Sequence, residues 1–98
     1  MSGEGTMQLE NLVEQAKKGD QQAFEALYQQ TYRLVYFHAK AITKSDEEAL
    51  DLVQDTFLAA YRSLSRLKDS RNFRKWISRI AFNLGCKKQC QLKKMADK

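Results

Sequence analysis

The absence of proline most narrows the folds open to this chain of 98 residues. Without proline, no position is barred from a helix interior. β-Branched residues are also few, with three Val, three Ile and four Thr, whereas the good helix formers Ala, Leu, Gln, Lys, Arg and Glu are abundant. A chain of this length builds a single hydrophobic core. We therefore predict an all-α fold, a small helical bundle of three long helices plus a short N-terminal helix.

Apolar residues spaced three and four apart indicate where the helices lie. We expect them at about residues 8–18, 21–42 and 46–67, and from residue 73 into the lysine-rich end. Gly19 and Asp20 should form the first corner, and Ser45 with Glu48 should form a capping box before the third helix. The expected organisation is a flexible N-terminus at residues 1–7, a helical domain at 8–92 and a basic tail at 93–98.

The same periodicity predicts which side chains are buried. On the third helix it assigns Leu50 and Tyr61 to the core, together with Phe57. Tyrosines spaced four apart on the second helix are expected at the core margin, since half-buried tyrosines are common there; they are Tyr28, Tyr32 and Tyr36. Gly85 is expected to weaken the fourth helix, because glycine is a poor helix former.

Charge is divided unequally along the chain. Residues 1–55 hold five basic and ten acidic side chains, whereas residues 56–98 hold twelve basic and two acidic ones. The first half therefore has a net charge of −5 and the second half of +10. This division suggests two faces with different partners, the basic one suited to a polyanion. A basic tail that only keeps a helix end in solution is the simpler alternative.

Several function classes lack the residues that they need. The chain has one histidine, His38, and two cysteines, Cys86 and Cys90, which are too few ligands for a zinc site. It has no nucleophile with an activating base and no glycine-rich phosphate loop, so we expect no enzyme, no metal and no cofactor. The predicted helices are too long for a helix-turn-helix motif. With no apolar run near 20 residues and no signal peptide, we expect a cytoplasmic protein with reduced thiols and no membrane insertion.

Basic and aromatic residues are interleaved in residues 71–88. Cations for phosphates and flat rings for unstacked bases are what single-stranded nucleic acid requires. Arg79, Asn83 and Lys87 recur at intervals of four and form one polar stripe, on which Asn83 suits a base edge and the two cations suit phosphates. Phe73 and Trp76 fit a stacking platform, but residues of this size fit a hydrophobic core equally well.

Three motifs make the sequence resemble a known family. They are Gly19-Asp20-x-x-Ala23-Phe24-x-x-Leu27-Tyr28, Asp51-Leu52-Val53-Gln54-Asp55-Thr56-Phe57 and Phe73-Arg74-x-Trp76-Ile77-x-Arg79-Ile80-Ala81-x-Asn83. Together they resemble the second region of bacterial sigma factors of the extracytoplasmic-function (ECF) group of the sigma-70 family, over about residues 9–90. Members of this group ordinarily carry a second domain for the promoter minus-thirty-five element. No segment of these residues resembles it, so we expect that domain to be absent from this chain.

The resemblance implies a transcription-initiation factor with two binding surfaces. One would bind the clamp helices of the largest-type subunit of RNA polymerase core; it comprises Asp51, Leu52, Gln54, Asp55 and Phe57. The other would recognise the promoter minus-ten element as a melted single strand; it comprises Lys68, Ser70, Arg71, Asn72, Phe73, Arg74, Trp76, Arg79, Asn83 and Lys87. The family also implies an inhibitory anti-sigma factor as a partner.

Two other interpretations of the residues remain. The chain could be a helical protein-interaction domain whose basic helix has nonspecific affinity for polyanions or membrane surfaces. It could also be a redox-responsive helical protein that uses Cys86 and Cys90, which lie four apart on one helix. A preference for single-stranded over double-stranded DNA would favour the promoter function, and a thiol-dependent change in affinity would favour the redox one.

Overall fold

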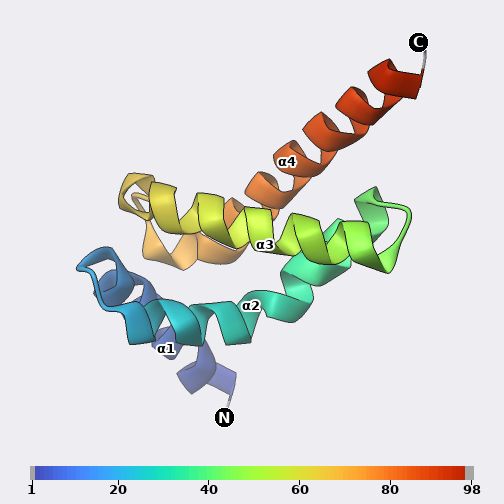
Figure 1. Cartoon of the computed structure of the whole chain (residues 1–98). Helices are drawn as coiled ribbons and strands as arrows, with labels where there is room; N and C mark the ends of the chain where they lie inside the picture. The colour runs from blue at the N-terminus through green and yellow to red at the C-terminus, as the bar shows by residue number, and fades with distance from the viewer. Residues whose placement is uncertain (1, 97–98) are drawn as a thin grey trace.

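The computed structural model describes the backbone of residues 2–96 and the side chains of residues 9–88. The described residues form helices α1 (Ser2–Lys17), α2 (Gln21–Ile42), α3 (Asp46–Ser63) and α4 (Phe73–Ala96), with two short 3-10 turns between α3 and α4 (Figure 1). These turns are η1 (Leu64–Arg66) and η2 (Ser70–Asn72). The predicted all-α bundle is confirmed. Helix α1 begins at Ser2 instead of near residue 8, since nothing in that segment blocks a helix as proline would.

Local sequence signals fix the end of α1 and the start of α2. Gly19 has a φ of +103°, the left-handed conformation that glycine adopts without strain, and it ends α1 as predicted. The carboxylate of Asp20 accepts hydrogen bonds from the amides of Gln22 and Ala23, at 3.0 and 3.2 Å. Such an N-cap satisfies amides that have no partner inside the helix. The sharp corner between α1 and α2 therefore follows from two adjacent residues.

The capping box before α3 differs from the prediction by one residue. The hydroxyl oxygen of Ser45 accepts from the amide of Glu48 at 3.2 Å, as expected. The Glu48 carboxylate accepts from the amide of Lys44 at 3.1 Å, not from the amide of Ser45. The Glu48 side chain is long enough to reach past the N-cap to the amide of Lys44, and this amide has no partner inside a helix. The first turn of α3 is also acidic, which suits the positive end of the helix dipole.

Helix α3 ends four residues earlier than its apolar pattern suggested. It stops at Ser63 and tightens into η1, which turns the chain while keeping Leu64 and Leu67 buried. Asp69 then caps η2 by accepting from the amide of Arg71 at 3.0 Å, and α4 starts directly at Phe73. The segment 64–72 therefore consists mainly of two ordered 3-10 turns that connect α3 to the start of α4.

Helix α2 lies at the centre of the bundle, in contact with α1, α3 and α4. The largest fully buried side chains come from every helix; they include Val13, Leu27, Val35, Leu52, Val53, Phe73 and Ile77. The predicted core-margin tyrosines are half-buried against this core, which confirms that prediction. Leu50 and Tyr61, predicted to be buried, are 46% and 50% exposed, because both line open hollows between α2 and α3 instead of the core.

Gly85 has a packing role that its helix propensity did not suggest. It is buried where α4 crosses the other helices. A Cβ atom at this position would lie 2.7 Å from Cγ2 of Ile42 and 3.0 Å from Cδ2 of Leu52. Only glycine therefore allows α4 to approach α2 and α3 this closely. Beyond the crossing, α4 projects past the other helices (Figure 1).

Candidate nucleic-acid interface

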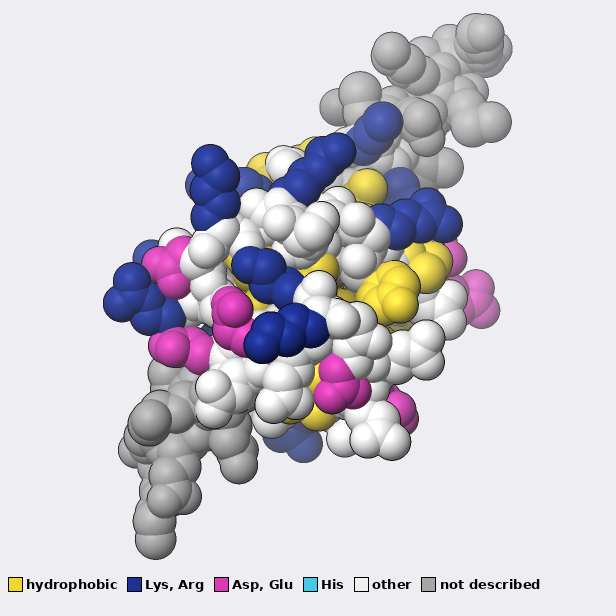
Figure 2. All heavy atoms as spheres, turned by 90° about the vertical axis from the view of Figure 1, so that its left-hand side faces the viewer, with side chains coloured by type: hydrophobic (Ala, Val, Ile, Leu, Met, Phe, Trp, Pro, Cys, Tyr) yellow, Lys and Arg dark blue, Asp and Glu magenta, His cyan; other side chains and the backbone are white. Residues whose placement is uncertain are grey.

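A basic hollow lies where the segment 64–72 meets the start of α4. It has a volume of about 400 Å³ and is lined by Arg66, Leu67, Lys68, Asp69, Asn72, Lys75, Trp76 and Arg79. Four of these eight side chains are cations and one is a carboxylate. Figure 2, which faces this end of the molecule, shows Lys and Arg side chains spread over the surface. An anionic ligand with a flat apolar part would match this lining.

The two aromatic residues at the start of α4 have different positions. Phe73 is completely buried, so it is a core residue, and the expectation that it contacts DNA is wrong. Its place at the first position of α4, beneath both turns, explains this burial. Trp76 is half-buried, packs on the core edge with its ring centroid 5.9 Å from that of Phe73, and lines the basic hollow. Trp76 thus packs against the core on one side and lines the hollow on the other, and its role as a stacking platform stays a prediction.

Ser70 is an anchor of the turn and not an exposed contact. It is only 8% exposed, and its hydroxyl donates a hydrogen bond to the carboxylate of Glu14 on α1. The ammonium of Lys17, also on α1, donates to the carbonyl oxygen of Leu67 at 2.6 Å. The expectation that Ser70 contacts DNA is wrong, because its side chain points to α1. Sequence reasoning missed Glu14 and Lys17, since their partners are 56 and 50 residues away in the chain.

Arg71 and Asp69 brace the turn from within. The guanidinium of Arg71 donates to both carboxylate oxygens of Asp69, each at 3.1 Å. These hydrogen bonds hold the pKa of Asp69 below its usual range. Arg71 is thus exposed but engaged with its own turn, while Lys68 and Asn72 are exposed beside it.

The predicted polar stripe on α4 is exposed as a unit. Arg79, Asn83 and Lys87 are all exposed, and none of them forms an ion pair with another described side chain. Arg79 reaches the basic hollow, and Asn83 follows one turn later. Arg74 is also exposed, at the start of the same helix. The stripe therefore continues the positive surface of the hollow along α4.

The second predicted surface, on α3, is only partly exposed. Asp51 and Gln54 are exposed and Asp55 is half-exposed. Leu52 is fully buried and Phe57 is 4% exposed, so the expectation that these two contact a partner is wrong. Both belong to the apolar periodicity that faces the core.

A lysine from α4 partly neutralises this acidic surface. The ammonium of Lys88 lies 2.5 Å from a carboxylate oxygen of Asp51 and 2.5 Å from one of Asp55. Burial lowers the pKa of Lys88, but the two hydrogen-bonded carboxylates outweigh that effect and leave the pKa above its usual value. Lys88 thus joins the helix of the basic stripe to the helix of the acidic surface, a link that local sequence patterns do not reveal.

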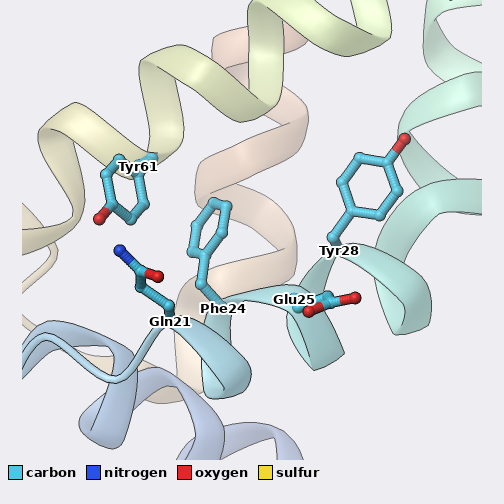
Figure 3. A pocket seen from close by; sticks show the side chains of 5 residues that line it. All are labelled: Gln21, Phe24, Glu25, Tyr28 and Tyr61. Atoms are coloured by element: carbon cyan, nitrogen blue, oxygen red, sulfur yellow. The ribbon is translucent and has the colours of Figure 1, made fainter.

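An apolar groove beside the acidic surface was not predicted. It runs between α2 and α3 through three adjoining hollows, of which the one in Figure 3 has a volume of about 450 Å³. In that hollow, Tyr61 of α3 lies over Phe24 of α2, with ring centroids 5.0 Å apart (Figure 3). Leu50 and Leu58 are exposed further along α3. Their spacing, with Tyr61 three residues beyond, was the sequence signal for an apolar face on this side of the helix.

These surfaces sit on a fold that matches a described family. Residues 27–86, more than half of the chain, match the family model for sigma-70 region 2. The chain belongs to the sigma-70 region 2 family. Helix α1 lies outside the matched residues, although it holds the segment 64–72.

Curated relatives of this region 2 chain are sigma factors. RNA polymerase sigma factor NccH of Alcaligenes xylosoxydans xylosoxydans is 36% identical over 74 residues, which are 76% of this chain and 40% of the relative. ECF RNA polymerase sigma factor SigW of Bacillus subtilis is 33% identical over 86 residues, or 80% of this chain and 42% of the relative. The chain therefore spans about two fifths of the length of these relatives.

A solved structure shares the fold of this region 2 chain. It is the NMR structure of the complex formed by an engineered region 2 of sigmaE with GTAAAA. It is 31% identical and superposes with a TM-score of 0.80, covering 88% of this chain and 90% of the other.

Other types of site find little support in the described residues. Among the described side chains, no group of three His, Cys, Asp or Glu residues could hold a metal ion. Within residues 2–96, no helix combines the length and the apolarity needed to cross a bilayer. Cys86 is an exposed free thiol, and the side chain of Cys90 lies outside the described residues.

Proposed function

We propose that this chain binds RNA polymerase core and recognises and melts the promoter minus-ten element during transcription initiation. The observation that carries the proposal is the half-buried Trp76 in a hollow ringed by four cations. The engineered region 2 of sigmaE, which has the same fold, was solved in complex with GTAAAA. Family and geometry thus favour the same ligand class, single-stranded DNA.

The basic hollow would act by capturing a base that has left the duplex stack. Stacking of a base on an aromatic ring is worth about 1–3 kcal/mol. Unpairing and unstacking a base costs a few kcal/mol, so capture together with phosphate contacts offsets much of that cost. Trp76 would supply the ring, Lys68 and Arg79 the phosphate contacts, and Asn83 a contact to a neighbouring base edge. The chain would need no active site of its own, because polymerase performs the chemistry.

The acidic surface of α3 would bind the clamp helices of the polymerase. Asp51, Gln54 and Asp55 present polar groups, and the apolar groove beside them offers Leu58 and Tyr61 for packing. Charged rims steer encounter, and apolar contacts at the centre of an interface supply most of the affinity. An inhibitory anti-sigma factor is a further proposed partner of the chain. The proposed place of action is the cytoplasm.

The DNA role is tested with Asn83→Ala on a set of single-stranded minus-ten variants. If Asn83 reads a base, the variant loses roughly 1–3 kcal/mol of discrimination at one position and keeps its affinity for polymerase core. If Asn83 only braces the helix surface, the melting temperature falls and base preference is unchanged. Equal affinity of the wild type for single strands, duplex and heparin would support nonspecific polyanion binding instead.

The polymerase role is tested with Asp55→Lys in a pull-down with core enzyme at low salt. We expect weaker association at unchanged helical content, since reversing a rim charge mainly harms encounter and register. Gln30→Lys, which adds a cation at an exposed position of α2, is the control. Unchanged binding of Asp55→Lys would remove this surface from the proposal.

A further inference from the structure

Helix α1, which precedes the residues matched by the family model, forms hydrogen bonds with the segment that lines the basic hollow. Lys17 binds the carbonyl oxygen of Leu67, and Glu14 accepts from the hydroxyl of Ser70. Both side chains lie on the last turn of α1, whereas the residues that match the family model begin only at residue 27. The two hydrogen bonds therefore bracket Lys68 and Asp69, which line the hollow.

The carbonyl oxygen of Leu67 and the hydroxyl of Ser70, which form these two hydrogen bonds, have few alternative partners. Leu67 and Ser70 are 5% and 8% exposed, so their polar groups have little access to water. A buried polar group that loses its partner costs more than an ordinary hydrogen bond contributes, and charged partners make the stronger bonds. Lys17 and Glu14 are charged partners of this kind. Removing either one should let the segment 67–70 leave its position.

Helix α1 is itself fixed independently of these two bonds. Leu9, Val13 and Ala16 bury one face of α1 in the core, and the Gly19 corner sets its direction. The polar side chains Glu14 and Lys17 project from the part of α1 that contacts η1 and η2. Substituting them should therefore change the position of the segment more than the fold. The Arg71–Asp69 pair braces η2 from within but does not tie it to the core.

We propose that Glu14 and Lys17 are positioning residues that set base selection by the hollow. The proposal rests on the proposed function, since it assigns a role in the same DNA site. The basic hollow can select among bases only if the polar groups at its rim are held in fixed positions. On this account, part of the sequence preference of this chain is determined by α1.

The test compares variants by the ratio of their affinities for a preferred and a disfavoured single-stranded hexamer, both selected with the wild type. Lys17→Met and Glu14→Ala should lower this ratio roughly tenfold, the size of one lost base contact. Glu14→Gln keeps an acceptor and Lys17→Arg keeps a donor, so both should retain most of the preference. Lys18→Met removes the same charge from an exposed neighbour and is the control for phosphate attraction. Melting curves confirm that each variant is folded at the assay temperature.

The possible outcomes separate the two claims. Loss of the ratio in Lys17→Met and Glu14→Ala, with Lys18→Met and the conservative variants unaffected, supports positioning by α1. An unchanged ratio in both disruptive variants overturns it while leaving the promoter function intact. The same fall in Lys18→Met as in Lys17→Met also overturns it, since charge alone would then explain the effect. A wild type without any base preference overturns the proposed function itself, and the positioning role with it.

Discussion

Replacing Gly85 with alanine tests the close crossing of α4 over α2 and α3. The new Cβ would lie 2.7 Å from Cγ2 of Ile42 and 3.0 Å from Cδ2 of Leu52, both well inside contact distance. The Ile42 methyl sits on a branched carbon with few open rotamers, and Leu52 is fully buried. An added methyl in a packed core costs roughly 1–3 kcal/mol, whereas alanine in place of glycine gains about 1 kcal/mol in helix propensity. The packing cost should exceed the gain in helix propensity, so that Gly85→Ala lowers the free energy of unfolding by about 1 kcal/mol.

The assay is urea and thermal unfolding followed by circular dichroism. For a domain of this size, a loss of about 1 kcal/mol lowers the melting temperature by roughly 4–8 °C. Cys86→Ala is the matched control, because it improves helix propensity at the next, exposed position without meeting the core. We expect this control to be as stable as the wild type or more stable. If Gly85→Ala is stabilised as much as Cys86→Ala, the helices do not cross as closely as described.

Three further perturbations test the charged groups. Lys88→Met should lower the free energy of unfolding by roughly 0.5–1 kcal/mol at low salt, because it leaves two carboxylates unneutralised; a loss that is equal in 1 M salt would speak against an ion pair. Hydrogen bonds from Lys40 and Tyr36 hold the pKa of Asp46 below its usual value. The ionised Asp46 carboxylate therefore stabilises the fold fully above its pKa in the unfolded chain, and this stabilisation is lost as pH falls through its lower pKa in the folded protein. Asp46→Asn should therefore be less stable than the wild type near pH 6, and a gap that does not close below about pH 4 would contradict this. Arg79→Ala should weaken binding to all single strands about equally and reduce the salt slope by about 0.7, whereas an effect on one sequence alone would make Arg79 a base reader.

Features encoded by neighbouring residues could be predicted from the sequence. The bounds of α2 follow from Gly19 and Asp20 before it and from the apolar periodicity within it. The exposed stripe of Arg79 and Asn83 follows from helical spacing alone. In each case the signal and the structure it determines lie within a few turns of helix, so tertiary packing had little opportunity to override them.

Features that depend on distant contacts could not be predicted. Ser70 is polar and sits in a turn, which favours exposure, yet a hydrogen bond to Glu14 draws it inward. Phe73 has the flat aromatic ring that a stacking platform needs, but as the first residue of α4 it is buried in the core. The role of Gly85 depends on where three helices cross. Local patterns carry no information about such pairings.

Fluorescence of Trp76 during DNA titration tests most directly whether the basic hollow captures an unstacked base. Trp76 is the only tryptophan of the chain, so its emission reports this site alone. The preferred single-stranded hexamer, a scrambled single strand and the duplex of the preferred sequence would be titrated at one salt concentration. We predict quenching by the preferred single strand with at least about tenfold higher affinity than for the other two ligands. Equal affinity for all three ligands, or binding that leaves the emission unchanged, would contradict the claim.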